Sequence, residues 1–128
     1  MNESCTIILP LPPYVLSPNC QAGSRGACMK KAQASKRYKR LAREATRAEA
    51  IETGPWKKVV ATAIFFHKTV RRRDGVNHNA MLKAAHDGMI DAGLVVDDDS
   101  KHWTTEPPDF QIDREYPRVE ITVERAEI

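Results

Sequence analysis

The sequence predicts a small α+β domain in which two main helices accompany a mixed β-sheet. Stretches dominated by β-branched and aromatic residues, or alternating apolar and polar residues, favour strands. Two other stretches favour helices, one because Ala, Lys, Arg and Glu dominate it. The length of 128 residues fits a single domain covering 1–128.

The chain is expected to open with a short strand, a proline-rich loop and a long helix. Residues 4–10, SCTIILP, favour the strand, and the prolines that follow prevent regular pairing. The loop is expected to continue through SRGACM. Residues 29–52 should then form the helix, because good helix formers dominate them, and Gly54-Pro55 should end it.

A long strand is predicted next over 56–70, WKKVVATAIFFHKTV, and the loop RRRDGVNHN follows at 71–79. The second helix is predicted over 79–92, with Asn77 or Asn79 as its N-cap and Gly93 at its C-terminal end. LVVDD predicts a brief strand. HWTTEPPDFQIDREYP should be irregular with at most one strand, and alternation in RVEITVE predicts the final strand.

Composition argues against a membrane or secreted protein. No apolar run reaches the length of about 18 residues that spans a bilayer. The N-terminal stretch lacks a basic start, and prolines break its apolar run, so no signal peptide is expected. Three cysteines without a CxxC pair predict thiols in a reducing cytoplasm.

Charge is divided unevenly along the chain. Residues 1–73 hold 15 Lys and Arg against 4 Asp and Glu, whereas residues 74–128 hold 5 against 13. This asymmetry suggests a polyanionic partner for one surface, although the two halves could instead screen each other. On the predicted long helix, helical spacing puts one basic set on one face: Lys36, Arg40, Arg43 and Arg47. That face predicts nucleic-acid contact or an ordinary basic surface, and Tyr38 is expected to pack inside.

The acidic residues suggest a metal site. Asp74 follows three arginines, and Asp97, Asp98 and Asp99 follow an apolar run. Converging carboxylates repel one another and need a compensating cation, for which Mg²⁺ is suited by its preference for oxygen ligands. The alternative is a solvated turn at 97–99. Lys83 and Asp87 are four residues apart on the predicted helix, so they share a face and form either part of the site or a plain ion pair.

These motifs together resemble the RusA family of Holliday junction resolvases, many of which come from phages and prophages. RRRDGVN, LKAAHDGMIDAGLVVDDDS and PRVEITV carry the resemblance, and ILPLPPYVLSPN resembles the family's N-terminal strand and proline loop. The resemblance implies an endodeoxyribonuclease that uses Mg²⁺, or Mn²⁺ in its place, to cut four-way junctions and other branched DNA by paired nicking. It also implies a homodimer in the cytoplasm of a bacterial or phage-infected cell.

Site residues follow from the resemblance position by position. The expected catalytic residues are Asp74, Lys83, Asp97 and Asp98, and the three aspartates among them are the expected metal ligands. Asp87 matches the acid four residues after the lysine, and Asp99 replaces Asp98 if the register shifts by one. The expected DNA contacts are Arg71, Arg72, Arg73, Lys36, Arg40, Arg43 and Asn77.

Val76 departs from the family pattern, which has a second aspartate there. On an extended segment, side chains 74 and 76 point to the same side, so Val76 would remove one carboxylate from the metal site. In a second register, Asn77 and Asn79 replace both acids. Either register leaves open a protein that binds branched DNA without cutting it. A third interpretation, an RNA-binding or ribosome-associated basic protein, fits the charge alone.

Overall fold

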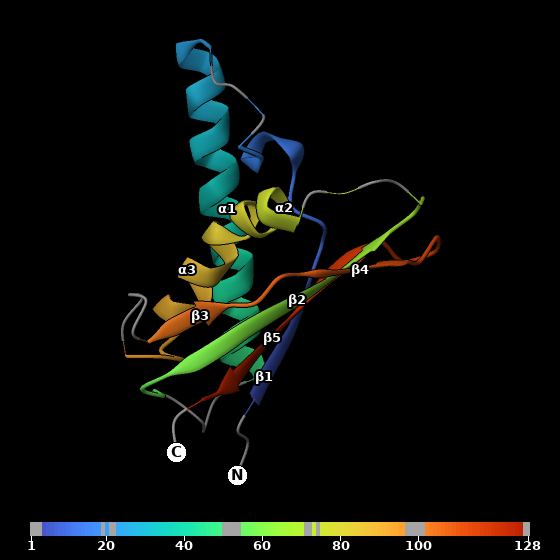
Figure 1. Cartoon of the computed structure of the whole chain (residues 1–128). Helices are drawn as coiled ribbons and strands as arrows, with labels where there is room; N and C mark the ends of the chain where they lie inside the picture. Colours follow the sequence, from blue (N-terminus) through green and yellow to red (C-terminus); the bar gives the residue numbers. More distant parts are fainter. Residues whose placement is uncertain are drawn as a thin grey trace.

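A computed structural model describes residues 4–18, 20, 23–49, 55–70, 73, 75–96 and 102–126 of the chain. In this part of the chain, a mixed five-stranded sheet packs against three α-helices (Figure 1). The predicted α+β class and the mixed sheet are therefore confirmed, and the prediction of two main helices falls one short. None of the described helices is long and apolar enough to cross a membrane.

The sheet is built around its longest strand. The strands are β1 (Ser4–Leu9), β2 (Val59–His67), β3 (Trp103–Thr105), β4 (Asp109–Ile112) and β5 (Arg118–Arg125). β5 lies between β1 and β2 and is antiparallel to both. β3 and β4 pair in parallel with two successive parts of β2, so they share its other edge.

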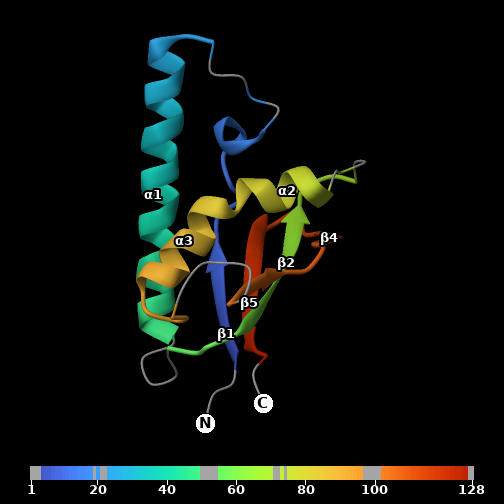
Figure 2. The same ribbon diagram turned by 60° about the vertical axis from the view of Figure 1, so that its left-hand side comes forward.

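One face of the sheet carries the core. In β5, Val119, Ile121 and Val123 are buried, while the residues between them lie on the opposite face, as the period of two requires. The helices all lie against this apolar face (Figure 2). The opposite face has no helix over it among the described residues, and there the hydroxyl groups of Thr6 and Thr122 are 3.0 Å apart.

The helical layer consists of α1 (Arg25–Glu49), α2 (Gly75–Met81) and α3 (Lys83–Asp91). A short 3₁₀ helix, η1 (Tyr14–Leu16), lies in the proline-rich loop. On α1, Tyr38, Ala42 and Thr46 are buried at a spacing of four residues, and they form its inward stripe. The Tyr38 hydroxyl donates a hydrogen bond of 2.7 Å to the carbonyl oxygen of Pro10, so the expectation of a packed tyrosine is confirmed.

The helices α1 and α3 cross at Gly88. A Cβ atom built on Gly88 would overlap the carbonyl oxygen of Lys39 and would lie 3.0 Å from the backbone nitrogen of Arg43. Only glycine fits this crossing without moving a backbone. Across the same interface, the Lys39 ammonium lies 3.1 Å from the Asp91 carboxylate.

Several predicted boundaries are wrong. α1 begins at Arg25 rather than at residue 29, because the Ser24 hydroxyl accepts a hydrogen bond from the Ala27 N–H and provides the N-terminal cap. The loop predicted over SRGACM is therefore largely helical. α1 ends at Glu49, and the predicted stop at Gly54 lies outside the described residues. The strand predicted over 56–70 is shorter, at Val59–His67.

The second predicted helix is two helices. α2 starts at Gly75, so Asn77 and Asn79 lie inside a helix and neither caps one. The break falls at Leu82, whose N–H donates to the carbonyl oxygen of Asn79 three residues back, which tightens the turn as in a 3₁₀ helix. The C-terminal prediction is confirmed, because Gly93 has a φ of 91° and its N–H donates to the carbonyl oxygen of Ile90.

The segments after α3 also differ from expectation. Where LVVDD was expected to form a strand, its described residues 94–96 form an isolated parallel bridge between Val95 and Trp56, and its two aspartates lie outside the described residues. The segment expected to hold at most one strand contains two, β3 and β4. The final strand is confirmed and extends to Arg125. Trp56 is buried in the core, and Trp103 packs against it.

Candidate functional site

The predicted site residues divide into two groups. Lys36, Arg40, Arg43, Arg73, Asn77 and Lys83 belong to the described part of the chain. The remainder lie outside the described residues: Arg71, Arg72, Asp74, Asp97, Asp98 and Asp99. The expected Mg²⁺ ligands are all in the second group, so the metal site stays a prediction. Among the described residues, no group of three or more His, Cys, Asp and Glu side chains could hold a metal ion.

Lys83 is the predicted catalytic residue that the structure places. It begins α3, its side chain is 79% exposed, and its Nζ atom lies 3.5 Å from Oδ2 of Asp87. The predicted spacing of four residues on one helical face is therefore confirmed. An exposed ammonium paired with a single carboxylate can reach a phosphate without first being desolvated, and such a pair contributes only about 0.3–0.5 kcal/mol to stability.

The described neighbours of the acidic segments lie near residues that flank or pair with different parts of β2. Residues next to Asp74 lie toward its second half: Gly75 is beside Pro108, which precedes the pairing of Asp109 with Ile64. At the other side of the acidic cluster, Val96 donates its N–H to the carbonyl oxygen of Trp56. His102 accepts a hydrogen bond from Val59, the first residue of β2. Val59 and Ile64 are five strand residues apart, which is about 16 Å.

Val76 lies inside α2 and its side chain is 80% exposed. The expectation of an extended segment at this position is therefore wrong. Because this position is exposed, a carboxylate at 76 would point into solvent. In the same helix, Asn79 donates a hydrogen bond of 2.9 Å from its amide nitrogen to the carbonyl oxygen of Glu106.

An aromatic cluster joins α2 to the end of β2. His78 contacts the rings of Phe65, Phe110 and His67 edge-on, with centroid distances of 5.0, 4.9 and 5.5 Å. The pKa of His67 is lowered to about 4, first by burial and then by its electrostatic interactions with Arg73 and His78. The cluster identifies His78 as a packing residue of this interface. Arg73 lies close to the same end of β2, because its guanidinium donates a hydrogen bond of 3.1 Å to the carbonyl oxygen of Thr69.

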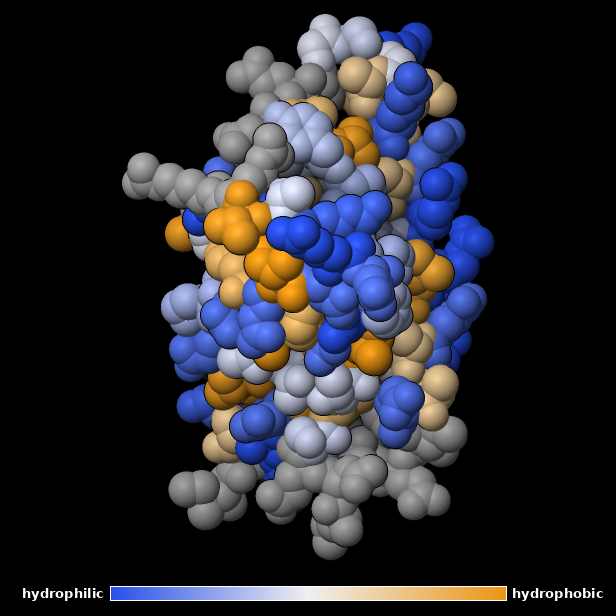
Figure 3. Space-filling view, turned by 90° about the vertical axis from the view of Figure 1, so that its right-hand side faces the viewer, coloured by the Kyte–Doolittle hydropathy of each residue, from blue (hydrophilic) through white to orange (hydrophobic). Residues whose placement is uncertain are grey.

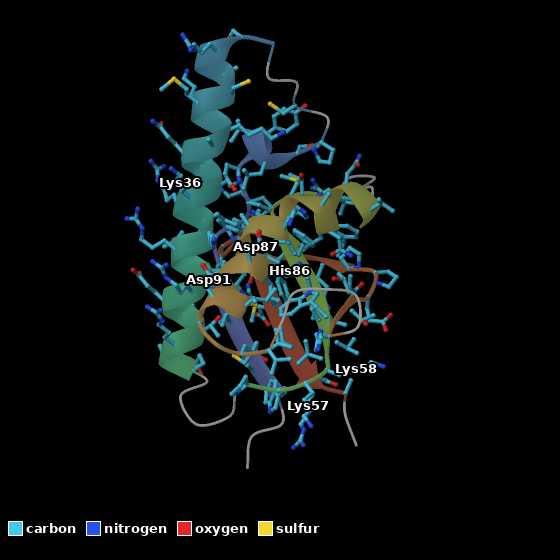
Figure 4. The ribbon with its side chains drawn as sticks, turned by 90° about the vertical axis from the view of Figure 1, so that its left-hand side faces the viewer. Lys36, Lys57, Lys58, His86, Asp87 and Asp91 are labelled. Atoms are coloured by element: carbon cyan, nitrogen blue, oxygen red, sulfur yellow. The ribbon has the colours of Figure 1, made fainter. Side chains whose placement is uncertain are left out.

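The basic face of α1 is partly as predicted. Lys36, Arg40 and Arg47 are exposed, whereas Arg43 is half-buried and its Nε atom is buried without a hydrogen-bond partner among the described residues. Figure 4 shows Lys36 on α1, far from Lys57 and Lys58 at the start of β2. The latter two exposed lysines were not among the predicted contacts, because no helical or motif spacing singles them out.

The end of the sheet nearest α2 has a mixed surface. Val70, Val76 and Ile112 are exposed by 83%, 80% and 44%, and all three come from segments around the end of β2 and β4. Figure 3 views the molecule from the side where these strands end, and it shows hydrophobic residues gathered within a largely hydrophilic face. A protein surface of this kind can contact another macromolecule through both apolar and charged groups.

His86 is a half-buried titratable group beside the candidate lysine. Its ring lies 5.1 Å from the ring of Trp103, centroid to centroid. Burial lowers the pKa of His86 to about 4, Asp87 opposes this change, and Lys83 reinforces it. The imidazole is therefore neutral in the folded protein near pH 7.

Acidification should destabilise the protein through His86. Between pH 6.5 and about 4, the unfolded chain binds a proton that the folded chain excludes, so stability is complete above pH 6.5 and falls toward pH 4. We expect the free energy of unfolding to be lower at pH 5 than at pH 7.5 by about 2 kcal/mol from this group. Urea titrations at both pH values measure it. His86→Gln should lose that part of the dependence, with His102→Gln as the matched histidine substitution. An unchanged dependence in His86→Gln would contradict the assignment.

Comparison with known proteins adds no relative: neither a protein-family model nor a curated protein matches this chain.

Proposed function

We propose that this chain is a RusA-like, Mg²⁺-dependent endodeoxyribonuclease that binds four-way junctions and other branched DNA and nicks them in pairs. The observation that carries the proposal is the position of Lys83. It begins α3 as an exposed cation beside Asp87, in the spacing that the resemblance to RusA enzymes requires. The α+β fold with a mixed sheet is compatible with that resemblance.

The proposed chemistry gives separate tasks to the aspartates and to the lysine. Asp74, Asp97 and Asp98 would hold Mg²⁺, which supplies charge neutralisation at the phosphate and an oriented water. The Lys83 ammonium would contact the non-bridging oxygens of the same phosphate, where negative charge increases in the transition state. Asn77 would help to position the DNA backbone.

DNA binding is assigned to the basic surfaces. Lys36 and Arg40 project from the exposed side of α1, and Arg73 lies beyond the end of β2. Together with Arg71 and Arg72, these side chains would neutralise phosphates on the arms of the junction. Phosphate contacts supply affinity without reading sequence, which suits a protein that recognises a branched shape.

Salt dependence tests the arginine contribution. We expect a flatter slope of log K against log salt when Ala replaces Arg71, Arg72 and Arg73 together. The slope should change by about 0.9 for each phosphate that the variant no longer neutralises. Fluorescence anisotropy with a four-way junction over a range of KCl concentrations gives the slope. Lys57→Ala with Lys58→Ala is the control, which removes two positive charges at the other end of β2. An equal slope in the arginine variant and the natural protein would remove the arginines from the DNA surface.

Paired nicking requires two copies of the site. A twofold axis through a homodimer would place two identical sites on opposite strands of the branch point. We therefore expect a dimer at micromolar concentration in light scattering, with or without DNA. A monomer under both conditions would contradict the dimer and the paired-nicking mechanism together.

A second candidate function is binding of branched DNA without cutting. One observation favours it: Val76 cannot ligate a metal and is exposed within α2.

Incubation with a labelled four-way junction separates the two functions. The nuclease predicts nicked products that depend on Mg²⁺ or Mn²⁺ and disappear with EDTA. Binding without cutting predicts a retarded complex on a native gel and no product at any metal concentration. Preference for single-stranded RNA over the junction at equal salt would contradict both and support the RNA-binding interpretation.

A further inference from the structure

A groove lies between the N-terminal half of α1, η1 and the α2–α3 pair. Its volume is about 470 Å³, which falls in the range of small-molecule sites. Leu16 contributes from η1, Ala32 from α1, Ala80 from α2 and Ala84 from α3. These small apolar side chains leave room for a flat group between the helices. The ribbons that form its walls are seen together in Figure 2.

The groove exists because α1 is much longer than the helix it crosses. α1 has 25 residues and α3 has 9. The inward stripe of α1 packs in the core from Tyr38 onward, and the same stripe continues toward the N-terminus at Ser35 and Lys31, where it lines the groove. Among the described residues, this end of the stripe is only partly covered by η1, which leaves surface that a ligand can cover.

Charge at the rim favours an anion. Lys31 reaches the groove from α1, and Lys83 and Asp87 reach it from α3. Asp87 is paired with Lys83, so the three side chains leave one positive charge in excess. Figure 4 shows Asp87 on the side of α3 that faces α1. Two cations on opposite walls above an apolar floor match a ligand with a phosphate at one end and a flat ring at the other.

We propose that this groove binds one unpaired nucleotide of a DNA strand. Its base would lie against Ala32, Ala80 and Ala84, and its phosphate would contact Lys31, while Lys83 on the opposite wall stays with the phosphate that is cut. The inference rests on the proposed function and narrows its substrate class: branched DNA that carries an unpaired nucleotide, such as a flap or a gapped junction, is favoured over a fully paired junction.

Two substitutions test the groove while leaving the core intact. Ala32 is exposed on α1, so Ala32→Phe fills the groove from its open side, and Lys31→Ala removes one cation. The controls are Ala48→Phe and Lys30→Ala, at exposed positions of the same helix that do not line the groove. Circular dichroism spectra that match the natural protein establish that each variant is folded.

Binding of a short fluorescent oligothymidylate is the main readout. We expect Ala32→Phe to weaken it about tenfold, because the phenyl ring would occupy the space proposed for the base; tenfold corresponds to about 1.4 kcal/mol. Lys31→Ala should reduce the salt slope by about 0.7, the value for one phosphate of a single strand. Both controls should bind like the natural protein. Equal binding by Ala32→Phe and Ala48→Phe would overturn the proposal.

Cys28 gives a second readout, because it is exposed and lines the groove. Oligothymidylate should slow alkylation of Cys28 by iodoacetamide, measured by mass spectrometry, with Cys20 as the internal reference. Alkylation of Cys28 at an unchanged rate would overturn the proposal. If Ala32→Phe changes the oligomeric state in light scattering but not the binding of oligothymidylate, the groove is a protein–protein interface. That outcome would also overturn the proposal.

The experiments distinguish failure of the groove proposal from failure of the proposed nuclease function. Junction nicking by Ala32→Phe at the natural rate on fully paired DNA, together with a lower rate on a flap, supports both proposals. Absence of nicking on every substrate in the natural protein refutes the nuclease, while oligothymidylate binding at the groove is measured independently.

Discussion

Asp74→Asn should abolish Mg²⁺-dependent nicking of a four-way junction while leaving junction affinity unchanged. The substitution removes a negative oxygen ligand but no cation, and hard metal ions lose affinity as ligand charge falls. Asp98→Asn should act in the same way. The measurement is nicking rate against Mg²⁺ concentration, with binding followed separately by anisotropy in EDTA.

Glu124→Gln is the matched control for this series. Glu124 is an exposed carboxylate on β5, and its neutralisation changes net charge by the same amount. It should cut like the natural protein. Val76→Asp should also leave the rate unchanged, because the side chain at 76 is 80% exposed within α2. Cutting by Asp74→Asn at the natural rate would show that the metal mechanism is wrong.

Gly88→Ala should destabilise the fold by about 3 kcal/mol or more. The added methyl would overlap the carbonyl oxygen of Lys39, and backbone cannot rotate away as a side chain can. The two helices would have to separate, which would also strain the ion pair between Lys39 and Asp91. Urea unfolding at neutral pH, followed by circular dichroism, measures the decrease in stability.

The matched control for the crossing is Gly26→Ala. Gly26 is also a glycine of a helix, and a Cβ built there meets no atom within 4 Å among the described residues. It should be neutral or stabilising by up to about 1 kcal/mol, because alanine has the higher helix propensity. If both variants have the same stability, the close crossing at Gly88 is not a constraint on this fold.

The alternation of residues along the sequence was sufficient to predict the long strands that have one face against the core. β2 and β5 alternate buried and more exposed residues, and β-branched residues dominate both, so each was identified from its own sequence. β3 and β4 were not, because they are short strands held by pairing with one edge of β2. Pairing between distant segments leaves little signal in residues such as Asp109 and Gln111.

The candidate site was predictable only where spacing on one helix decides geometry. Lys83 and Asp87 meet because they are four residues apart on α3. The contact of His78 with Phe110 depends on the register that pairs Phe65 with Phe110, which no local pattern contains. The start of α2 at Gly75 was missed for a related reason: RRRDGVNHN has turn-forming residues, and packing against Phe65 and Phe110 favours the helix instead.

The central position of β5 has a consequence for synthesis of the protein. β5 joins β1 to β2, and its partner residues on β1 are far away in the chain, with Ser4 opposite Glu124. During translation, β1 therefore lacks the strand partner that the structure describes until β5 has left the ribosome, although α1 can already pack against it. Such distant pairing is also slow to form. A nascent chain stalled before residue 118 should consequently be sensitive to proteases and dependent on chaperones.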